Sequence, residues 1–188
     1  MPTVFITGCP GAGKSTLGRR LAQETGATQM YIDGLKKVMA KNPSLKPWVY
    51  FFSRLDEAHY WRTTDAQEHW LHMVAQSDAF WPHVKPVIEA FVKKHDAVIV
   101  DGANMMPHLV ARDYPHMKGV VLLPPSRREL LRRLQTEPRW SRENPELLSL
   151  EAKRYWQESK RYARAARRYG YPVFRDADKA FAYLKAVL

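Results

Sequence analysis

Residues 3–16 read TVFITGCPGAGKST, an apolar run followed by a glycine-rich stretch, a lysine and two hydroxyl side chains. Within it, residues 8–15 match the spacing G-x-x-x-x-G-K-[ST] between an expected strand and an expected helix, the setting that this phosphate-binding motif requires. Gly8, Gly11 and Gly13 let the backbone fold closely around an anion, with N–H groups turned inward at a helix N-terminus. The stretch therefore predicts a site for nucleotide phosphates.

Each position of this loop has an expected contact with the phosphates. Lys14 is expected to supply a positive charge to the β- and γ-phosphates of ATP, with its tip facing solvent when no ligand is bound, and Ser15 to offer a hydroxyl ligand to Mg²⁺. Cys9 lies inside the loop. It has two interpretations, as a redox group or nucleophile, or simply as a variable loop residue. The expected nucleotide-binding residues are Gly8, Gly11, Ala12, Gly13, Lys14, Ser15 and Thr16.

Short apolar runs alternate with helical patterns along the rest of the chain, which predicts an α/β fold. The expected strands are residues 3–7, 28–32, 97–100, 119–123 and 171–174. The first, third and fourth are almost entirely apolar, as in strands covered on both faces, so the second and fifth are expected at the sheet edges. Helices are expected over residues 14–25, 64–94, 127–134 and 147–169.

About sixty residues, 35–95, separate the second expected strand from the third, far more than a crossover needs. We expect this insertion to form a helical cap over a substrate. Thr64 has the spacing of a capping box with Gln67 at a helix start, and Pro82 and Pro86 are expected to kink or divide the helix. The aromatic side chains between Trp48 and Trp81 either form a small core or line a pocket. His69 and His72, one helical turn apart, form a possible metal pair.

Two aspartates follow expected strands and are expected to meet at the carboxyl edge of the sheet, where α/β proteins bind ligands. Asp101 ends the run Val98-Ile99-Val100 and is expected beside Ser15, as a second group for Mg²⁺. Asp33 follows the second strand and is expected to reach the acceptor hydroxyl. Each aspartate has an alternative interpretation as a turn or helix cap.

Composition sets the class of molecule. The chain has 188 residues, 45% of them hydrophobic, a formal net charge of +11 and one cysteine, which fits one globular domain over residues 1–188 without an intrachain disulfide. No apolar run is long enough to cross a membrane, and the start lacks a signal-peptide pattern, so we expect a cytoplasmic protein. Residues 126–168 hold 13 basic and six acidic side chains, a block that attracts phosphates.

These residues together resemble the P-loop kinases of the nucleoside-monophosphate-kinase group, which includes adenylate, shikimate and gluconate kinases, chloramphenicol phosphotransferase and zeta-toxin-like kinases. The resemblance rests on the order of five strands, residues 8–16, Asp33, Asp101 and the arginines after the fourth strand. It implies a three-layer P-loop NTPase fold with a parallel sheet of order 2-3-1-4-5. Within the group, Gln67, Pro82, Val87-Ile88 and residues 98–107 look most like 2-phosphoglycerate kinase.

The resemblance also implies an arginine-rich lid over about residues 126–145. By that likeness Arg133 stacks on the adenine, and Arg139 and Arg142 neutralise the transferred phosphoryl group. Arg128 and Arg132 are either lid contacts or solvated helix charges. Farther along, Arg154 and Arg161 belong to a basic helix face that either is simply solvated or reaches a phosphate.

Three functions remain open at this point. The first is an ATP-dependent kinase whose acceptor is a small metabolite, phosphorylated or neutral. The second is a polynucleotide or RNA-end kinase, suggested by the net positive charge and the aromatic cluster, because a basic groove with stacking aromatics holds single strands. The third is a non-catalytic nucleotide-binding module. The chain has no N-K-x-D motif, which disfavours a GTPase.

Overall fold

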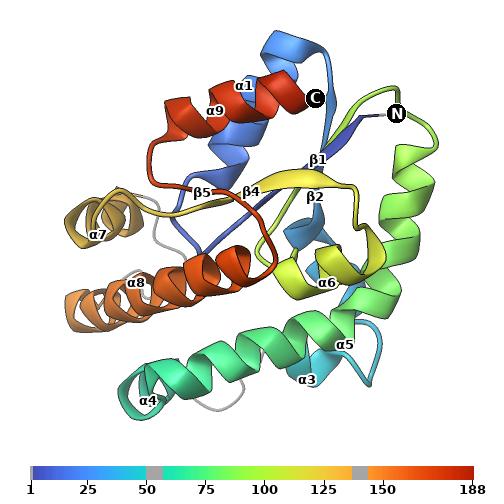
Figure 1. The fold of residues 1–188 in the computed structure, drawn as a ribbon. Helices are drawn as coiled ribbons and strands as arrows, with labels where there is room; N and C mark the ends of the chain where they lie inside the picture. The colour runs from blue at the N-terminus through green and yellow to red at the C-terminus, as the bar shows by residue number, and fades with distance from the viewer. Residues whose placement is uncertain (1, 50–56, 137–143) are drawn as a thin grey trace.

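Five parallel strands form one sheet in the order β2-β3-β1-β4-β5, as the resemblance implies (Figure 1). The computed structural model describes residues 2–49, 57–136 and 144–188. The strands are β1 (Thr3–Thr7), β2 (Thr28–Tyr31), β3 (Val98–Asp101), β4 (Lys118–Leu122) and β5 (Val173–Phe174). The weakly patterned strands β2 and β5 occupy the two edges, which confirms the expectation from their sequences. β5 is shorter than expected.

Parallel pairing brings the ends of β1, β2 and β3 to one edge of the sheet. Ile6 pairs with Asp101 across β1 and β3, and Tyr31 pairs with Asp101 across β2 and β3. Every residue of β3 is fully buried, and Val4, Phe5 and Ile6 of β1 are buried as well. Strands covered on both faces require such apolar runs, so the burial explains why these segments were recognisable in the sequence.

Helices cover both faces of the sheet, so the fold has three layers (Figure 1). Helices α1 (Lys14–Thr25) and α9 (Ala177–Val187) contact each other and lie on one face, where α1 contacts β1, β2 and β3 and α9 contacts β4. On the other side, α8 (Pro145–Arg168) contacts β4, α5 (Ala66–Val92) and α6 (Pro107–Asp113). Helix α7 (Arg127–Thr136) follows β4 and packs against α8.

The insertion between β2 and β3 is helical, as expected. It contains the 3₁₀ helix η1 (Ile32–Leu35), α2 (Lys36–Met39), α3 (Lys46–Val49), α4 (Glu57–Thr63) and α5. Pro82 and Pro86 lie inside α5 without dividing it, and Figure 1 shows the helix axis bending along its length, as a proline that removes a backbone donor allows. The cap of α5 is Asp65 and not Thr64: its carboxylate accepts hydrogen bonds from the backbone N–H groups of Gln67 and Glu68.

Helix α8 has a stripe of mostly apolar residues at helical spacing, which predicts that this face packs on the sheet, and the prediction is only partly correct. The stripe is formed by Leu148, Ala152, Tyr155, Ser159, Tyr162, Ala166 and Tyr169. Leu148, Ala152 and Ser159 are buried, but much of the stripe faces other helices. Tyr155 packs edge-on against Trp61 of α4, and Tyr162 packs edge-on against Trp70 of α5, which is how the cap helices are joined to α8. Tyr169, the last member of the stripe, follows the helix and is exposed.

Most of the described aromatic side chains of the cap belong to the core. Trp61, Phe80 and Trp81 are buried, whereas Trp48, Tyr60 and Trp70 are partly buried and pack against them or their neighbours. Tyr50, Phe51 and Phe52 lie outside the described residues. In the described ranges, no helix has the length and apolar character that spanning a bilayer would take.

Candidate functional site

The glycine-rich loop connects β1 to α1 and follows the backbone geometry that its sequence predicts. Gly13 occupies the N-cap of α1 with φ 98°, a left-handed conformation that favours glycine, and no side chain caps the helix there. A Cβ atom at Gly8 would collide with the carbonyl oxygen of Leu122, so only glycine lets the loop pass this close to β4. The first-turn N–H groups of α1 are thus left for an anionic ligand.

Lys14 lies differently from what we expected. We predicted that its tip faces solvent without ligand, but the residue is only 6% exposed and its Nζ donates a hydrogen bond to the Cys9 carbonyl oxygen at 3.1 Å. The ammonium needs an acceptor when no phosphate is present, and the Cys9 carbonyl of its own loop provides one. Cys9 is buried, and nothing in its placement supports the redox or nucleophile interpretation.

Asp101 is fully buried at the end of β3, beside Ser15 as expected. Burial raises the pKa of its carboxyl group, while the positive charge of Lys14 and the nearby Ser15 hydroxyl act in the opposite direction. The side chain of Gln29, on β2, donates to Asp101 Oδ2 at 3.0 Å and to the Ser15 carbonyl oxygen at 3.4 Å. Gln29 therefore fixes the orientation of the carboxylate relative to the loop.

The donor set around Asp101 fits a Mg²⁺ ion that arrives with nucleotide phosphates. Asp101 Oδ1 is buried and has no hydrogen-bond partner within the part of the chain that the structure describes. A buried carboxylate oxygen left in this state favours a cation or its water shell. Mg²⁺ usually keeps several waters and takes one or two protein oxygens together with substrate phosphates, so Asp101 and Ser15 suffice without a larger cluster.

Asp33 approaches the same edge from η1, directly after β2. Its Oδ1 accepts a hydrogen bond from the backbone N–H of Ala103 at 3.3 Å, and its negative charge contributes to the raised pKa of Asp101. Gly102 makes this approach possible, because a Cβ atom there would collide with Ile32 and crowd Asp33 Oδ1. The two carboxylates are thus neighbours, as the strand pattern predicted, although β2 ends at Tyr31 and Asp33 lies in a 3₁₀ turn.

Burial of Asp101 leads to a prediction about stability. A carboxyl group whose pKa is higher in the folded state than in the unfolded state binds its proton more tightly when folded, so its ionised form destabilises the fold above that pKa. We expect Asp101→Asn to raise the melting temperature of the ligand-free protein at pH 7, and the gain to shrink as the pH falls and the wild-type carboxyl protonates. Thermal unfolding monitored at pH 4 to 8 measures this difference; a lower melting temperature at pH 7 would contradict it.

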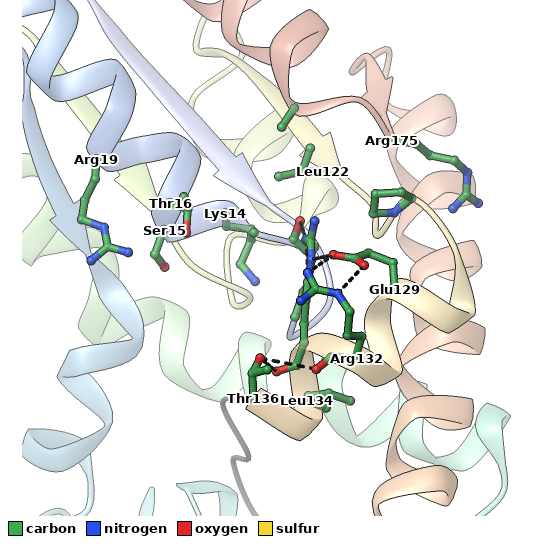
Figure 2. A pocket seen from close by; sticks show the side chains of 16 residues that line it. Lys14, Ser15, Thr16, Arg19, Leu122, Glu129, Arg132, Leu134, Thr136 and Arg175 are labelled. Carbon is green, nitrogen blue, oxygen red and sulfur yellow. Dashed lines mark hydrogen bonds and ion pairs between the residues drawn. The ribbon is translucent and has the colours of Figure 1, made fainter.

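A pocket of about 480 Å³ opens next to the loop. Figure 2 shows Lys14, Ser15 and Thr16 of α1 on one side of it and Glu129 and Arg132 of α7 on the other. The expected nucleotide-binding residues that line it are Gly11, Ala12, Gly13, Lys14, Ser15, Thr16 and Arg133. The remaining lining residues are Arg19, Leu122, Pro125, Glu129, Arg132, Leu134, Thr136, Arg175 and Ala177.

Arg133 contacts the loop itself. Its Nη1 donates to the carbonyl oxygens of Gly11 and Ala12 at 3.2 and 3.1 Å, and its Nε donates to Glu129. These bonds hold the guanidinium against the phosphate-binding loop, and its stacking on adenine stays a prediction. Arg139 and Arg142, the other two lid candidates, lie outside the described residues.

Sequence reasoning missed several residues of this site. Glu129 accepts hydrogen bonds from Arg132 and Arg133, which lower the pKa of its carboxyl group to about 2. It keeps the arginines ordered near the pocket, and its spacing of three and four residues from them was the available signal. Arg175 donates to the Pro124 carbonyl oxygen at 2.7 Å and lies over the Trp156 ring. No local pattern pointed to Arg175 or Gln29.

The histidine pair of the cap has other partners than a metal. The Tyr60 hydroxyl lies 2.8 Å from His69 Nδ1 and 3.3 Å from His72 Nδ1, and His69 Nε2 lies 3.1 Å from Glu158 Oε2. Considering only the described ranges, no group of three or more His, Cys, Asp or Glu side chains is placed to hold a metal ion. The pair therefore joins α4, α5 and α8.

Comparison with protein families identifies the chain. A family model described as an AAA domain matches residues 4–164, most of the chain, and the chain belongs to this family. No curated protein sequence matches it significantly.

Solved structures give the same fold. Shikimate kinase from Acinetobacter baumannii, in complex with shikimate, superposes with a TM-score of 0.54 at 15% identity, covering 100% of this chain and 93% of that one. Shikimate kinase from Bacteroides thetaiotaomicron gives 0.54 at 17% identity, with coverages of 98% and 96%. Deoxyadenosine kinase from M. mycoides with bound dATP gives 0.50 at 14% identity, with coverages of 99% and 98%. The fold is that of the P-loop kinases related to nucleoside-monophosphate kinases.

Proposed function

We propose that this protein is an ATP-dependent phosphotransferase that moves the γ-phosphoryl group of ATP to a hydroxyl or phosphate group of a small metabolite. One observation carries the proposal: Lys14, Ser15 and Asp101 meet at the carboxyl edge of the sheet, with a second carboxylate, Asp33, beside them. In a module that only bound nucleotide, Asp33 would serve only its structural hydrogen bond to the Ala103 backbone. In a kinase, a second carboxylate can orient the acceptor hydroxyl and accept its proton as a general base.

Each side chain has a distinct task in this scheme. The loop N–H groups and Lys14 hold the β- and γ-phosphates, and Lys14 exchanges its bond to the Cys9 carbonyl for the phosphate oxygens. Ser15 and Asp101 would hold Mg²⁺, which would neutralise charge on the phosphate groups during transfer. Asp33 orients an acceptor hydroxyl and accepts its proton as the acceptor oxygen bonds to the γ-phosphorus and the bond to ADP breaks.

A small acceptor with acidic groups fits the charge of the protein best. Residues 126–168 carry an excess of seven positive charges. Asp65, the N-cap residue of α5, has a lowered pKa, mainly because it accepts hydrogen bonds from two backbone N–H groups, and the nearby charges of Arg154 and Arg161 lower it further. Both arginines belong to α8, on the side near the start of α5. The likeness of residues 98–107 to 2-phosphoglycerate kinase favours a phosphorylated acceptor of that kind, with shikimate-like and nucleoside acceptors as the next candidates.

The test is a transfer assay with labelled ATP and Mg²⁺. The acceptors are 2-phosphoglycerate, shikimate, gluconate, deoxyadenosine and a 5′-hydroxyl oligonucleotide, with ATP hydrolysis in their absence as the reference. Transfer to at least one small acceptor, well above hydrolysis, is the expected result. Tight ATP binding without turnover on any acceptor would instead support a non-catalytic nucleotide-binding module. Because a ligand at 100 times its Kd adds about 2.7 kcal/mol of stability, a thermal-shift screen can rank acceptors beforehand.

A polynucleotide acceptor is the second candidate, and one observation favours it. Glu146, in the first turn of α8, is exposed, but the two later acidic side chains of the helix, Glu151 and Glu158, are both buried. The exposed charges of the later turns are therefore all positive. They belong to Lys153, Lys160, Arg164, Arg167 and Arg168. Within the described residues none of these five makes an ion pair with a carboxylate. Transfer to the oligonucleotide that weakens steeply with added salt would decide for this candidate.

A further inference from the structure

The backbone of Ala103, two residues after Asp101, is held from several sides. Its N–H donates to Asp33 Oδ1 at 3.3 Å. Its carbonyl oxygen accepts a hydrogen bond from the Tyr162 hydroxyl at 2.6 Å and a longer one from the Thr7 hydroxyl at 3.4 Å. Ala103 therefore lies between the second carboxylate of the site and a residue of α8 that is 59 positions away in the chain.

Burial and ring packing hold Tyr162 in this position. It is 0% exposed, and its ring packs edge-on against Trp70 of α5, with ring centroids 5.1 Å apart. Burial raises the pKa of its phenol well above the usual value, so the hydroxyl stays protonated and remains a donor. The bond to the Ala103 carbonyl therefore keeps its donor over the physiological pH range, and it connects α8 and the cap helix to the loop after β3.

The N–H and the carbonyl of Ala103 lie in the two peptide planes that meet at its Cα atom, so once the carbonyl is held, the N–H can move only by rotation about φ and ψ. The next residue, Asn104, is anchored independently: its Nδ2 donates to Gln76 Oε1 at 3.0 Å and to Ser77 Oγ at 2.9 Å. With Gly102 paired to Ile6 through its backbone N–H at 3.2 Å, the segment has little freedom to rotate. The Ala103 N–H is therefore a fixed donor that sets where the Asp33 carboxylate lies.

We propose that Tyr162 is a positioning residue, which through the Ala103 backbone holds Asp33 in place for the phosphoryl acceptor. It touches neither phosphate nor acceptor in this scheme. Its hydroxyl fixes the Ala103 carbonyl, the Ala103 N–H fixes Asp33, and Asp33 meets the acceptor hydroxyl. This inference rests on the proposed phosphotransfer function for its catalytic consequence, but the positional link itself exists without any substrate.

The first measurement needs no substrate. Tyr162→Phe removes only the hydroxyl, and amide hydrogen exchange followed by NMR reports on the Ala103 N–H of the ligand-free protein. We expect exchange at Ala103 to accelerate about two- to tenfold, the range that one hydrogen bond contributes. The amide of Ile6 in the buried strand β1 is the internal reference, because its exchange reports opening of the whole fold. Acceleration at Ala103 must exceed that at Ile6.

The matched control is Tyr114→Phe. The Tyr114 hydroxyl also donates to a backbone carbonyl, that of Lys85 at 3.4 Å, but it has no contact with Asp33 or Ala103. This variant loses a comparable group, and it is expected to leave both Ala103 exchange and phosphoryl transfer unchanged. It separates the loss of a phenol hydroxyl in general from the loss of this one.

The second measurement is a double-mutant cycle in the transfer assay, with 2-phosphoglycerate as the acceptor probe. We expect Tyr162→Phe to lower kcat by about tenfold with the KM for ATP unchanged, because a small displacement of a catalytic group is costly. In the Asp33→Asn background the same substitution is expected to have almost no further effect, since Tyr162 acts through Asp33.

The outcomes separate the two proposals. The role of Tyr162 is supported if Tyr162→Phe accelerates exchange more at Ala103 than at Ile6, and if its loss in kcat largely disappears in the Asp33→Asn background. Unchanged exchange at Ala103, equal acceleration at Ile6, or fully additive losses in kcat would overturn it. If the wild-type protein transfers no phosphoryl group to 2-phosphoglycerate or to the other acceptors, the proposed function fails, and the exchange experiment alone decides whether Tyr162 holds Ala103 and Asp33.

Discussion

Replacing Lys14 by alanine is expected to lower kcat/KM for phosphoryl transfer by at least about 10²–10³-fold, the loss typical of removing one preorganised donor from a developing charge. The fold should remain intact, because the Nζ of Lys14 makes one described hydrogen bond, to the Cys9 carbonyl, and no ion pair among the described residues. Initial-rate kinetics together with circular dichroism and a melting curve measure both quantities.

Lys185→Ala is the matched control for this substitution. Lys185 is a half-exposed lysine of α9 that pairs with Glu24 at 3.2 Å and does not line the pocket. It should keep nearly wild-type transfer, since exposed ion pairs contribute little. Near-normal turnover of Lys14→Ala under the same conditions would rule out the proposed kinase mechanism, because no other described residue replaces its charge inside the loop.

The second large effect separates the two carboxylates. Asp33→Asn is expected to lower kcat for transfer by about 10²–10⁴-fold, the contribution typical of a general base, while the affinity for ATP with Mg²⁺ stays nearly constant. Asp101→Asn is expected instead to raise the Mg²⁺ concentration needed for half-maximal activity, because Asp101 Oδ1 is the buried oxygen left for the ion or its water shell. Rates measured over a matrix of ATP, Mg²⁺ and acceptor concentrations distinguish the two.

The two substitutions control for each other, since both turn an aspartate into its amide at the same edge of the sheet. If Asp33→Asn loses ATP and Mg²⁺ binding but turns over normally at saturation, Asp33 belongs to the donor site. The assignment of roles would then have to be reversed. A variant pair with indistinguishable effects would show that the carboxylates act as one unit.

Much of the architecture of this protein could be predicted from local sequence patterns. The phosphate-binding loop was recognisable because an anion cradle needs glycines at fixed positions, a lysine and a helix start, all within eight neighbouring residues. The apolar runs of β1, β3 and β4 were recognisable because strands covered on both faces are mostly apolar, and the polar residues Thr3, Thr7, Asp101 and Lys118 all lie at strand ends. The sheet order came from the resemblance to P-loop kinases, and the pairing of the strands confirmed it.

The contacts of single side chains were predicted less well from the sequence. Lys14 was expected in solvent and instead bonds to its own loop, because a charged donor takes whatever acceptor folding places nearby. The stripe of α8 was expected on the sheet, yet Tyr155 and Tyr162 pack on cap helices. A hydrophobic period specifies which face of a helix is buried, but it does not specify what buries it.

The amino-acid order thus encodes the anion cradle, the central strands and the presence of two carboxylates at the sheet edge, since each depends on neighbours along the chain. Contacts between distant segments complete the candidate site: Gln29 on Asp101, Arg175 at the pocket next to the loop, and Tyr162 on the backbone of Ala103. Such contacts arise from strand pairing and helix packing across tens of residues, where spacing in the sequence carries no information about distance in space.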